Sequence, residues 1–128
     1  MVIAQSRRMG PIDDFRDLEV WQRSMDLAEL VLKAAPLLPP EERFGISAQL
    51  RDASVSIANN IAEGYGRGTR LDYLRFLRIA RGSANEVTTM LLLISRIGYL
   101  PSDLVNPMLS LADRVRPMLT KLIKSLEP

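Results

Sequence analysis

Apolar residues recur three and four positions apart along four long stretches of the chain, and this repeat constrains the fold more than any other feature. Such spacing places the side chains on one face of an α-helix. No stretch alternates with the period of two that is typical of a strand. The four stripes are Leu18, Trp21, Met25, Ala28, Leu32 and Ala35; Ile46, Leu50, Ala53, Ile57 and Ile61; Tyr73, Leu77, Ala80, Ala84, Val87, Leu91 and Ile94; and Leu104, Met108, Leu111, Val115, Met118, Leu122 and Leu126.

Proline, glycine and capping residues separate the four stretches. Pro40, followed by two acids, is typical of a helix start. Gly64 is expected to end the second helix, because glycine adopts the left-handed cap conformation. Thr69 can cap the third helix, which Gly98 is expected to close. Ser102 is the expected cap of the fourth helix.

These stretches predict an all-α fold, an antiparallel up-and-down four-helix bundle with short connections. The bundle is expected to form one domain over residues 13–128, since a chain of 128 residues suits a single core. Residues 1–12 are expected to form a flexible N-terminal arm.

The residue types that the chain lacks narrow its chemistry. It has no cysteine and no histidine, which removes disulfides, thiolate nucleophiles, the commonest general base and the commonest metal ligand. We therefore expect no metal, no cofactor and no enzymatic activity. The N-terminus has no signal-like apolar segment, and the longest apolar run, residues 90–94, is too short to cross a membrane. These features favour a cytoplasmic protein without a membrane partner.

The glycine-rich stretch 64–70, GYGRGTR, raises the question of a phosphate cradle. A dinucleotide fingerprint follows a strand, and a P-loop ends in lysine. Here a helix precedes the glycines and no lysine follows, so we favour a hinge that lets the chain leave one helix and enter the next. A nucleic-acid phosphate could still dock at the following helix N-terminus, beside Arg67 and Arg70.

Three polar residues, Asn59, Asn60 and Glu63, flank the core position Ile61 near the end of the second helix. They lack a nucleophile and a base partner. We expect them to hydrogen-bond the helix-end backbone and the next loop rather than to act in catalysis.

Positive charge is concentrated in the second half of the chain. Residues 1–64 hold seven Lys/Arg and ten Asp/Glu, a net −3, whereas residues 65–128 hold ten and five, a net +5. This asymmetry suggests an acidic partner, and arginine suits phosphates. A second basic line on the last helix comprises Arg114, Lys121 and Lys124. The candidate nucleic-acid-binding residues are Arg67, Arg70, Arg75, Arg78 and Arg81.

Apolar residues exceed what one helix seam requires. A helix that is apolar on several sides is buried on several sides, so we expect a homo-oligomer. Acids such as Glu19, Asp26 and Glu29 could then pair with the arginines of a neighbouring subunit. The residues expected to lie outside the stripes are Val20, Leu27, Val31, Leu71, Leu74, Leu92 and Leu93.

Four segments carry a family resemblance: DFRDLEVWQRSMDLA, FGISAQLRDASVSIANNIAEGYGRGT, DYLRFLRIARGSANEV and RIGYL. They resemble the 23S rRNA intervening-sequence protein family, also labelled four-helix bundle proteins and S23 ribosomal proteins. The most specific part is the signature SI-x-x-NIAEGYGR. For the signature positions the resemblance implies a structural or interfacial role. These positions are Ser56, Ile57, Asn60, Ile61, Glu63, Gly64, Tyr65 and Gly66.

The resemblance implies a four-helix bundle that assembles as a ring-shaped homo-oligomer, a pentamer. Related accessory proteins of diversity-generating retroelements are basic pentamers that engage a reverse transcriptase and nucleic acid. No catalytic activity is established for the family, so the resemblance implies none here.

Three functional hypotheses follow. The first is a non-enzymatic oligomeric four-helix bundle that binds RNA or a nucleic-acid-handling protein. The alternative is a structural scaffold with protein partners only, whose arginines are engaged in ion pairs between subunits. The third is an enzyme that uses Glu63 or Asp72, which the absence of histidine and cysteine disfavours.

Overall fold

The computed structural model describes residues 14–128, and the predicted arm over residues 1–12 lies outside them. The described chain is all-α, with four long helices and no strand. Short 3₁₀ turns stand before and after the first long helix. The elements are η1 (Phe15–Asp17), α2 (Glu19–Ala34), η2 (Ala35–Leu37), η3 (Pro40–Glu42), α3 (Ile46–Gly66), α4 (Arg70–Ile97) and α5 (Ser102–Leu126).

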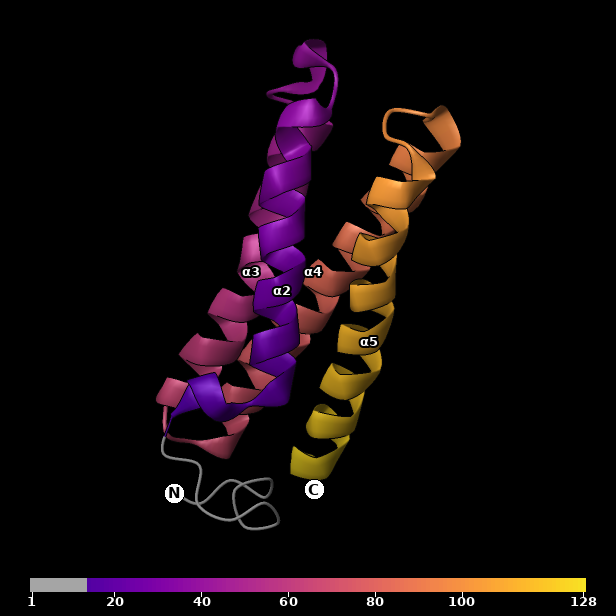
Figure 1. Cartoon of the computed structure of the whole chain (residues 1–128). Coiled ribbons are helices and arrows are strands. Elements are labelled where there is room, and N and C mark those ends of the chain that lie inside the picture. The colour runs from indigo at the N-terminus through magenta and orange to yellow at the C-terminus, as the bar shows by residue number, and fades with distance from the viewer. Residues whose placement is uncertain (1–13) are drawn as a thin grey trace.

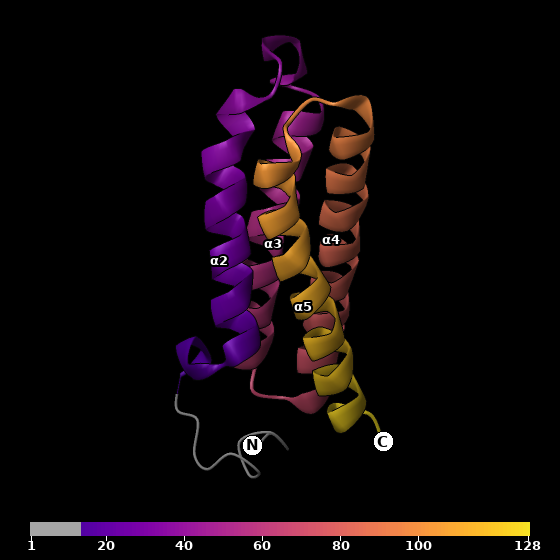
Figure 2. The same ribbon diagram turned by 45° about the vertical axis from the view of Figure 1, so that its right-hand side comes forward.

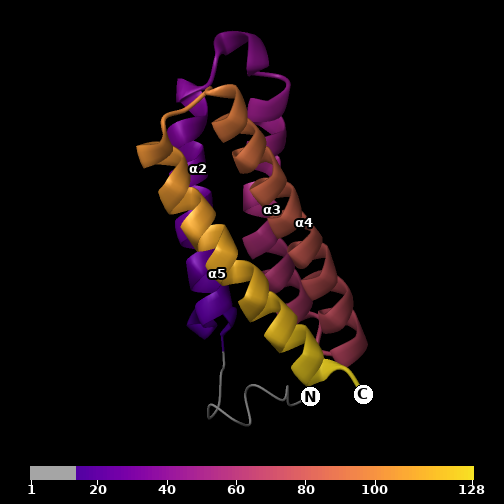
Figure 3. The same ribbon diagram turned by 90° about the vertical axis from the view of Figure 1, so that its right-hand side faces the viewer.

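Each long helix packs against two others: α2 against α3, α3 against α4, α4 against α5, and α5 against α2. Figures 1 and 2 show the helices lying alongside one another. The connections α2–α3 and α4–α5 lie at one end, and the connection α3–α4 lies at the other end with the start of α2 and the C-terminus. Figure 3 looks onto α4 and α5, the pair between which the candidate site lies.

The predicted stripe on α4 is confirmed at every position, since all seven residues from Tyr73 to Ile94 are buried. Four of the five predicted positions on α3 are buried as well, and the fifth, Ile46, is partly buried against the core. On α5 the buried members of the stripe are Met108, Val115, Leu122 and Leu126.

The predicted stripe on α2 is only partly confirmed: Leu18, Ala28 and Ala35 are buried and Trp21 packs against the core, but the centre of the buried face is rotated from the prediction. Met25 and Leu32 are 45% and 46% exposed, whereas Val20, Leu27 and Val31, expected outside the stripe, are buried. At about 100° per residue, α2 carries two apolar stripes roughly 120° apart. Spacing alone does not say which of them faces the core.

One prediction on α4 is also wrong. Leu74, expected to face away from the core, is buried, whereas Leu71, Leu92 and Leu93 are exposed as predicted. Leu74 lies about 60° around α4 from Leu77, close enough to the centre of the buried side to join the core cluster.

Two predicted helix ends are confirmed. Thr69 Oγ1 accepts a hydrogen bond from the Asp72 backbone N–H at 3.2 Å, and Gly98 ends α4 in the left-handed conformation with φ of 83°.

Two other ends differ from the prediction. Pro40 begins the turn η3 rather than a long helix, and α3 begins only at Ile46. Ser102 is the first residue of α5, and no side chain caps this helix.

Candidate nucleic-acid interface

Gly64 allows α3 and α4 to approach closely. It was expected to end a helix, but α3 continues through it to Gly66, and Gly64 is buried. A Cβ at this position would lie 2.7 Å from Phe76 Cβ and 3.3 Å from the Tyr73 carbonyl oxygen. The absence of a side chain is therefore a packing requirement. The turn into α4 is made instead at Gly68, with φ of 86°.

The polar signature residues link α3 to α4. Ser56 Oγ lies 3.0 Å from Ser83 Oγ, within hydrogen-bond distance. Asn60 Nδ2 donates to the Ser56 carbonyl oxygen at 2.8 Å and to Ser56 Oγ at 2.9 Å. These hydrogen bonds fix one turn of α3 against α4. Among the other signature residues, Ile57 and Ile61 are buried, and Tyr65 packs edge-on against Tyr73.

Two of the predicted arginines, Arg67 at the end of α3 and Arg75 in α4, lie over one aromatic ring. Arg67 and Arg75 both lie over the ring of Phe76, with guanidinium carbons 5.0 Å and 4.3 Å from its centroid. Arg67 Nε also donates to Glu63 Oε2 at 2.8 Å. The shallow hollow lined by Asn59, Glu63 and Arg67 thus contains a charge pair rather than excess positive charge.

Two further predicted arginines hold the end of α5. Arg70 Nη1 donates to the Leu126 carbonyl oxygen at 3.1 Å. Arg78 Nη2 pairs with Glu127 Oε2 at 2.8 Å. The Arg70 contact is part-buried and the Arg78 pair is exposed; such an exposed pair is of modest strength, but both contacts occupy these side chains within the chain. The five predicted arginines therefore do not form one surface.

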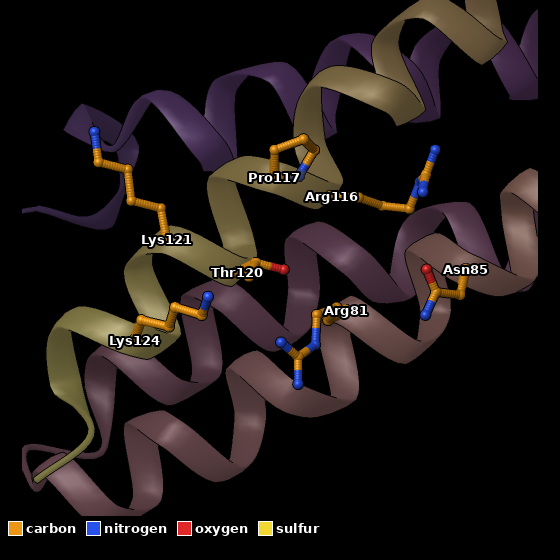
Figure 4. Close-up of a pocket in the computed structure, with 7 residues that line it drawn as sticks. All are labelled: Arg81, Asn85, Arg116, Pro117, Thr120, Lys121 and Lys124. Carbon is orange, nitrogen blue, oxygen red and sulfur yellow. The ribbon is translucent and has the colours of Figure 1, made fainter.

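Arg81 lies apart from the other four predicted arginines, in a groove between α4 and α5 with a volume of about 590 Å³. Figure 4 shows this site, which we call the basic groove. Four of its seven side chains are cationic, and none is acidic among the described residues that line it. The lining residues are Arg81 and Asn85 from α4, and Arg116, Pro117, Thr120, Lys121 and Lys124 from α5.

Some side chains of the basic groove reach inward from each of the two helices (Figure 4). Arg81 and Lys124 extend into the space between α4 and α5, the Thr120 hydroxyl points into it, and Lys121 points away from α4 (Figure 4). Arg116 pairs with Asp113 of the next turn back. Its Nε is buried and makes no hydrogen bond within the described chain.

The cationic side chains of the basic groove are suited to binding an anion. Arginine and lysine donate charge-assisted hydrogen bonds to phosphate oxygens, and a concave wall of one sign concentrates the field. The sequence prediction included Lys121 and Lys124 but missed Arg116. Arg116 could have been included from the sequence, because Arg116, Thr120 and Lys124 recur every four residues and so share one face of α5.

The second predicted basic line divides between two sides of α5. Lys124 lines the basic groove, whereas Arg114 Nη2 pairs with Glu19 Oε2 of α2 at 2.7 Å. Asp26 and Glu29, considered as partners for a neighbouring subunit, likewise pair within the chain, with Arg23 at 2.9 Å and with Lys33 at 2.8 Å.

A different side of α4 carries exposed apolar residues. Ile79, Leu93 and Ile97 are 43%, 46% and 53% exposed, and we call them the apolar face of α4. At about 100° per residue they lie on the order of 120° or more around the helix from Arg81. One helix therefore contributes to a basic groove and to a separate apolar surface.

No helix among residues 14–128 is both long enough and apolar enough to span a membrane. Within the same range, no three acidic residues gather where they could hold a metal ion.

Together the fold and the site define a class: an all-α protein of four long helices with a cationic groove between the last two. The family model described as 23S rRNA-intervening sequence protein matches residues 16–121, and the chain belongs to this family.

A solved structure agrees with this assignment. The chain is similar to a crystal structure of a protein with unknown function from the S23 ribosomal protein family of Bacteroides thetaiotaomicron VPI-5482, with 26% sequence identity and a TM-score of 0.76. The similarity covers 82% of this chain and 98% of that one. Comparison with curated proteins gives no match.

Proposed function

We propose that the chain is a non-enzymatic, antiparallel up-and-down four-helix bundle that forms a homo-oligomer in the cytoplasm and binds RNA. The basic groove is the observation that carries the proposal. Arg81 and Lys124 extend into one space from two helices, and no described acidic side chain lines that space. A polyanion neutralises such a cluster, whereas an isolated surface cation needs no partner.

Oligomerisation is supported by the apolar face of α4 and by exposed apolar residues on neighbouring helices. Ile79, Leu93 and Ile97 lie on one side of α4, and Met25 and Leu32 are exposed on α2. Several large apolar side chains exposed on one molecule are typical of subunit contacts. The family resemblance implies that the oligomer is a pentamer.

The second candidate function is a structural scaffold with protein partners only. It is favoured by the ion pairs that already engage Arg67, Arg78 and Arg114 within the chain. In this function an acidic surface of a nucleic-acid-handling protein would bind the basic groove. The chain would then bind that protein and not RNA.

The test compares two double charge reversals on the purified full chain, by fluorescence anisotropy with a labelled structured RNA at low salt. Arg81→Glu/Lys124→Glu changes the basic groove, and Arg75→Glu/Arg78→Glu makes the same change in charge outside it. We expect the groove variant to bind at least about tenfold more weakly, and the other variant to bind within about threefold of wild type.

Equal losses in the two variants would show that net charge, not the groove, governs binding. If wild type does not bind at low salt, the RNA proposal is wrong and the scaffold function stands.

A further inference from the structure

The length of the basic groove limits what it can hold. Arg116 and Lys124 are eight residues apart on α5, which corresponds to about 12 Å along the helix axis. A strand wound in a duplex advances roughly 3.4 Å along the axis per phosphate, and an extended single strand spaces its phosphates more widely. The row of cations therefore spans at most about three to four successive phosphates of one strand.

The groove suits one strand better than a duplex. Packed helices have axes about 8–10 Å apart, and their interdigitating side chains fill the space between the axes, so a bound strand lies in the surface groove that runs over α4 and α5. Domains that recognise duplex RNA contact about 16 base pairs across two minor grooves, a footprint several times longer than this row. No aromatic side chain lines the groove in the described chain, so base stacking does not contribute.

Two neutral polar side chains lie among the cations. The Asn85 amide and the Thr120 hydroxyl line the groove from opposite helices. Neither side chain hydrogen-bonds another described residue, and the backbone oxygen of Asn85 accepts from the Thr89 hydroxyl. They are free to pair with a neutral group of the bound strand, and the ribose 2′-hydroxyl is such a group.

We infer that the basic groove binds a single-stranded RNA segment of at most three to four nucleotides, with phosphates on Arg81 and Lys124 and on Arg116, where the phosphate competes with Asp113, and with ribose hydroxyls on Asn85 and Thr120. This inference rests on the proposed function and adds the form of nucleic acid that the groove selects. Because no base is stacked, binding tolerates changes of sequence.

The experiment measures anisotropy with three labelled probes at one salt concentration: a single-stranded RNA, the DNA of the same sequence, and the RNA paired with its complement. The full-length protein is used as wild type and as Thr120→Val/Asn85→Ala, which removes both neutral partners without changing the charge. Lys33→Gln/Arg43→Gln and Arg81→Gln/Lys124→Gln each remove two positive charges, outside and inside the groove. Thermal unfolding confirms that every variant is folded.

We expect single-stranded RNA to bind about fivefold more tightly than the matching DNA, and more tightly than the duplex. Thr120→Val/Asn85→Ala should abolish the RNA advantage and leave DNA binding unchanged. Arg81→Gln/Lys124→Gln should weaken the binding of every probe by roughly tenfold. Lys33→Gln/Arg43→Gln should weaken the binding of every probe by less than this.

Equal affinity for RNA and DNA, or a preference for the duplex, overturns this inference and leaves nucleic-acid binding in place. An RNA advantage that survives Thr120→Val/Asn85→Ala also overturns it. Failure of every probe to bind overturns the proposed function as well.

Discussion

Two sides of α4 differ in kind. The side toward α5 contributes Arg81 and Asn85 to the basic groove, whereas the apolar face presents Ile79, Leu93 and Ile97. Contacts made by the first side are electrostatic and weaken with salt, and contacts made by the second are hydrophobic and do not. The two proposed functions of α4, RNA binding and subunit assembly, therefore depend on different sides of the helix, and separate variants can test each of them.

The largest expected effect comes from placing charge on the apolar face. Ile79→Glu/Leu93→Glu should convert the homo-oligomer to single subunits, because burying unpaired carboxylates in a subunit contact costs several kcal/mol. Light scattering after size exclusion measures the mass. Arg81→Glu/Lys124→Glu is the control on the other side and should keep the wild-type mass. An unchanged mass for Ile79→Glu/Leu93→Glu would show that this face does not mediate assembly.

The close approach of α3 to α4 at Gly64 gives the next effect. Gly64→Val should lower the free energy of unfolding by roughly 1–3 kcal/mol, since its side chain would overlap Phe76 and the Tyr73 backbone. Urea unfolding measures this change. Gly82→Ala is a matched control, because no atom lies within 4 Å of its Cβ position, and it should stabilise the helix by up to about 1 kcal/mol. A well-tolerated valine at position 64 would contradict the packing role.

Much of the fold could be predicted from the sequence, and particular residues show where the prediction stopped. The α4 stripe from Tyr73 to Ile94 was identified because it is long and regular. The α2 stripe was only partly correct, with Ala28 buried but Met25 exposed, because Met25 and Val31 belong to two apolar stripes of similar strength. Which stripe faces the core depends on the positions of α3 and α5, and no local pattern contains that information.

The candidate site was harder to predict than the fold. Helical spacing grouped Arg75 and Arg78 with Arg81 on one helix, but the groove forms between Arg81 and α5 residues more than thirty positions later in the chain. Arg67 and Arg78 were candidates by residue type, and their carboxylate partners became visible only in the folded chain.

A smaller effect is expected where α3 and α4 share a hydrogen bond. Ser83→Ala should lower the free energy of unfolding by about 1 kcal/mol, because Ser56 loses a partner at a part-buried position. Thr89→Ala, which removes a hydroxyl bonded only within its own exposed helix turn, is the comparison and should change stability by less. Thermal unfolding of both variants tests this, and equal effects would argue against a special role for the Ser56–Ser83 contact.

The smallest effect lies outside both sides of α4, at η1. Hydrogen bonds from the Arg16 side chain and then from its backbone N–H lower the pKa of Asp14 from 3.8 to about 2. The folded pKa is below the ordinary value, so this contact stabilises η1 above about pH 4 and is lost as the pH falls toward 2. An NMR titration of the Asp14 carboxyl should show the lowered midpoint, and a midpoint near 3.8 would show that the contact is not populated.

The central claim is that the basic groove provides the cations that bind RNA, and the salt dependence of binding tests it most directly. For a single strand, the slope of log K against log salt concentration is about −0.7 per neutralised phosphate. Three groove cations therefore predict a slope of about −2. Arg81→Gln/Lys124→Gln should reduce its magnitude by about 1.4, whereas Lys33→Gln/Arg43→Gln should leave it unchanged. If the groove variant keeps the wild-type slope, the bound phosphates lie elsewhere and the account is wrong.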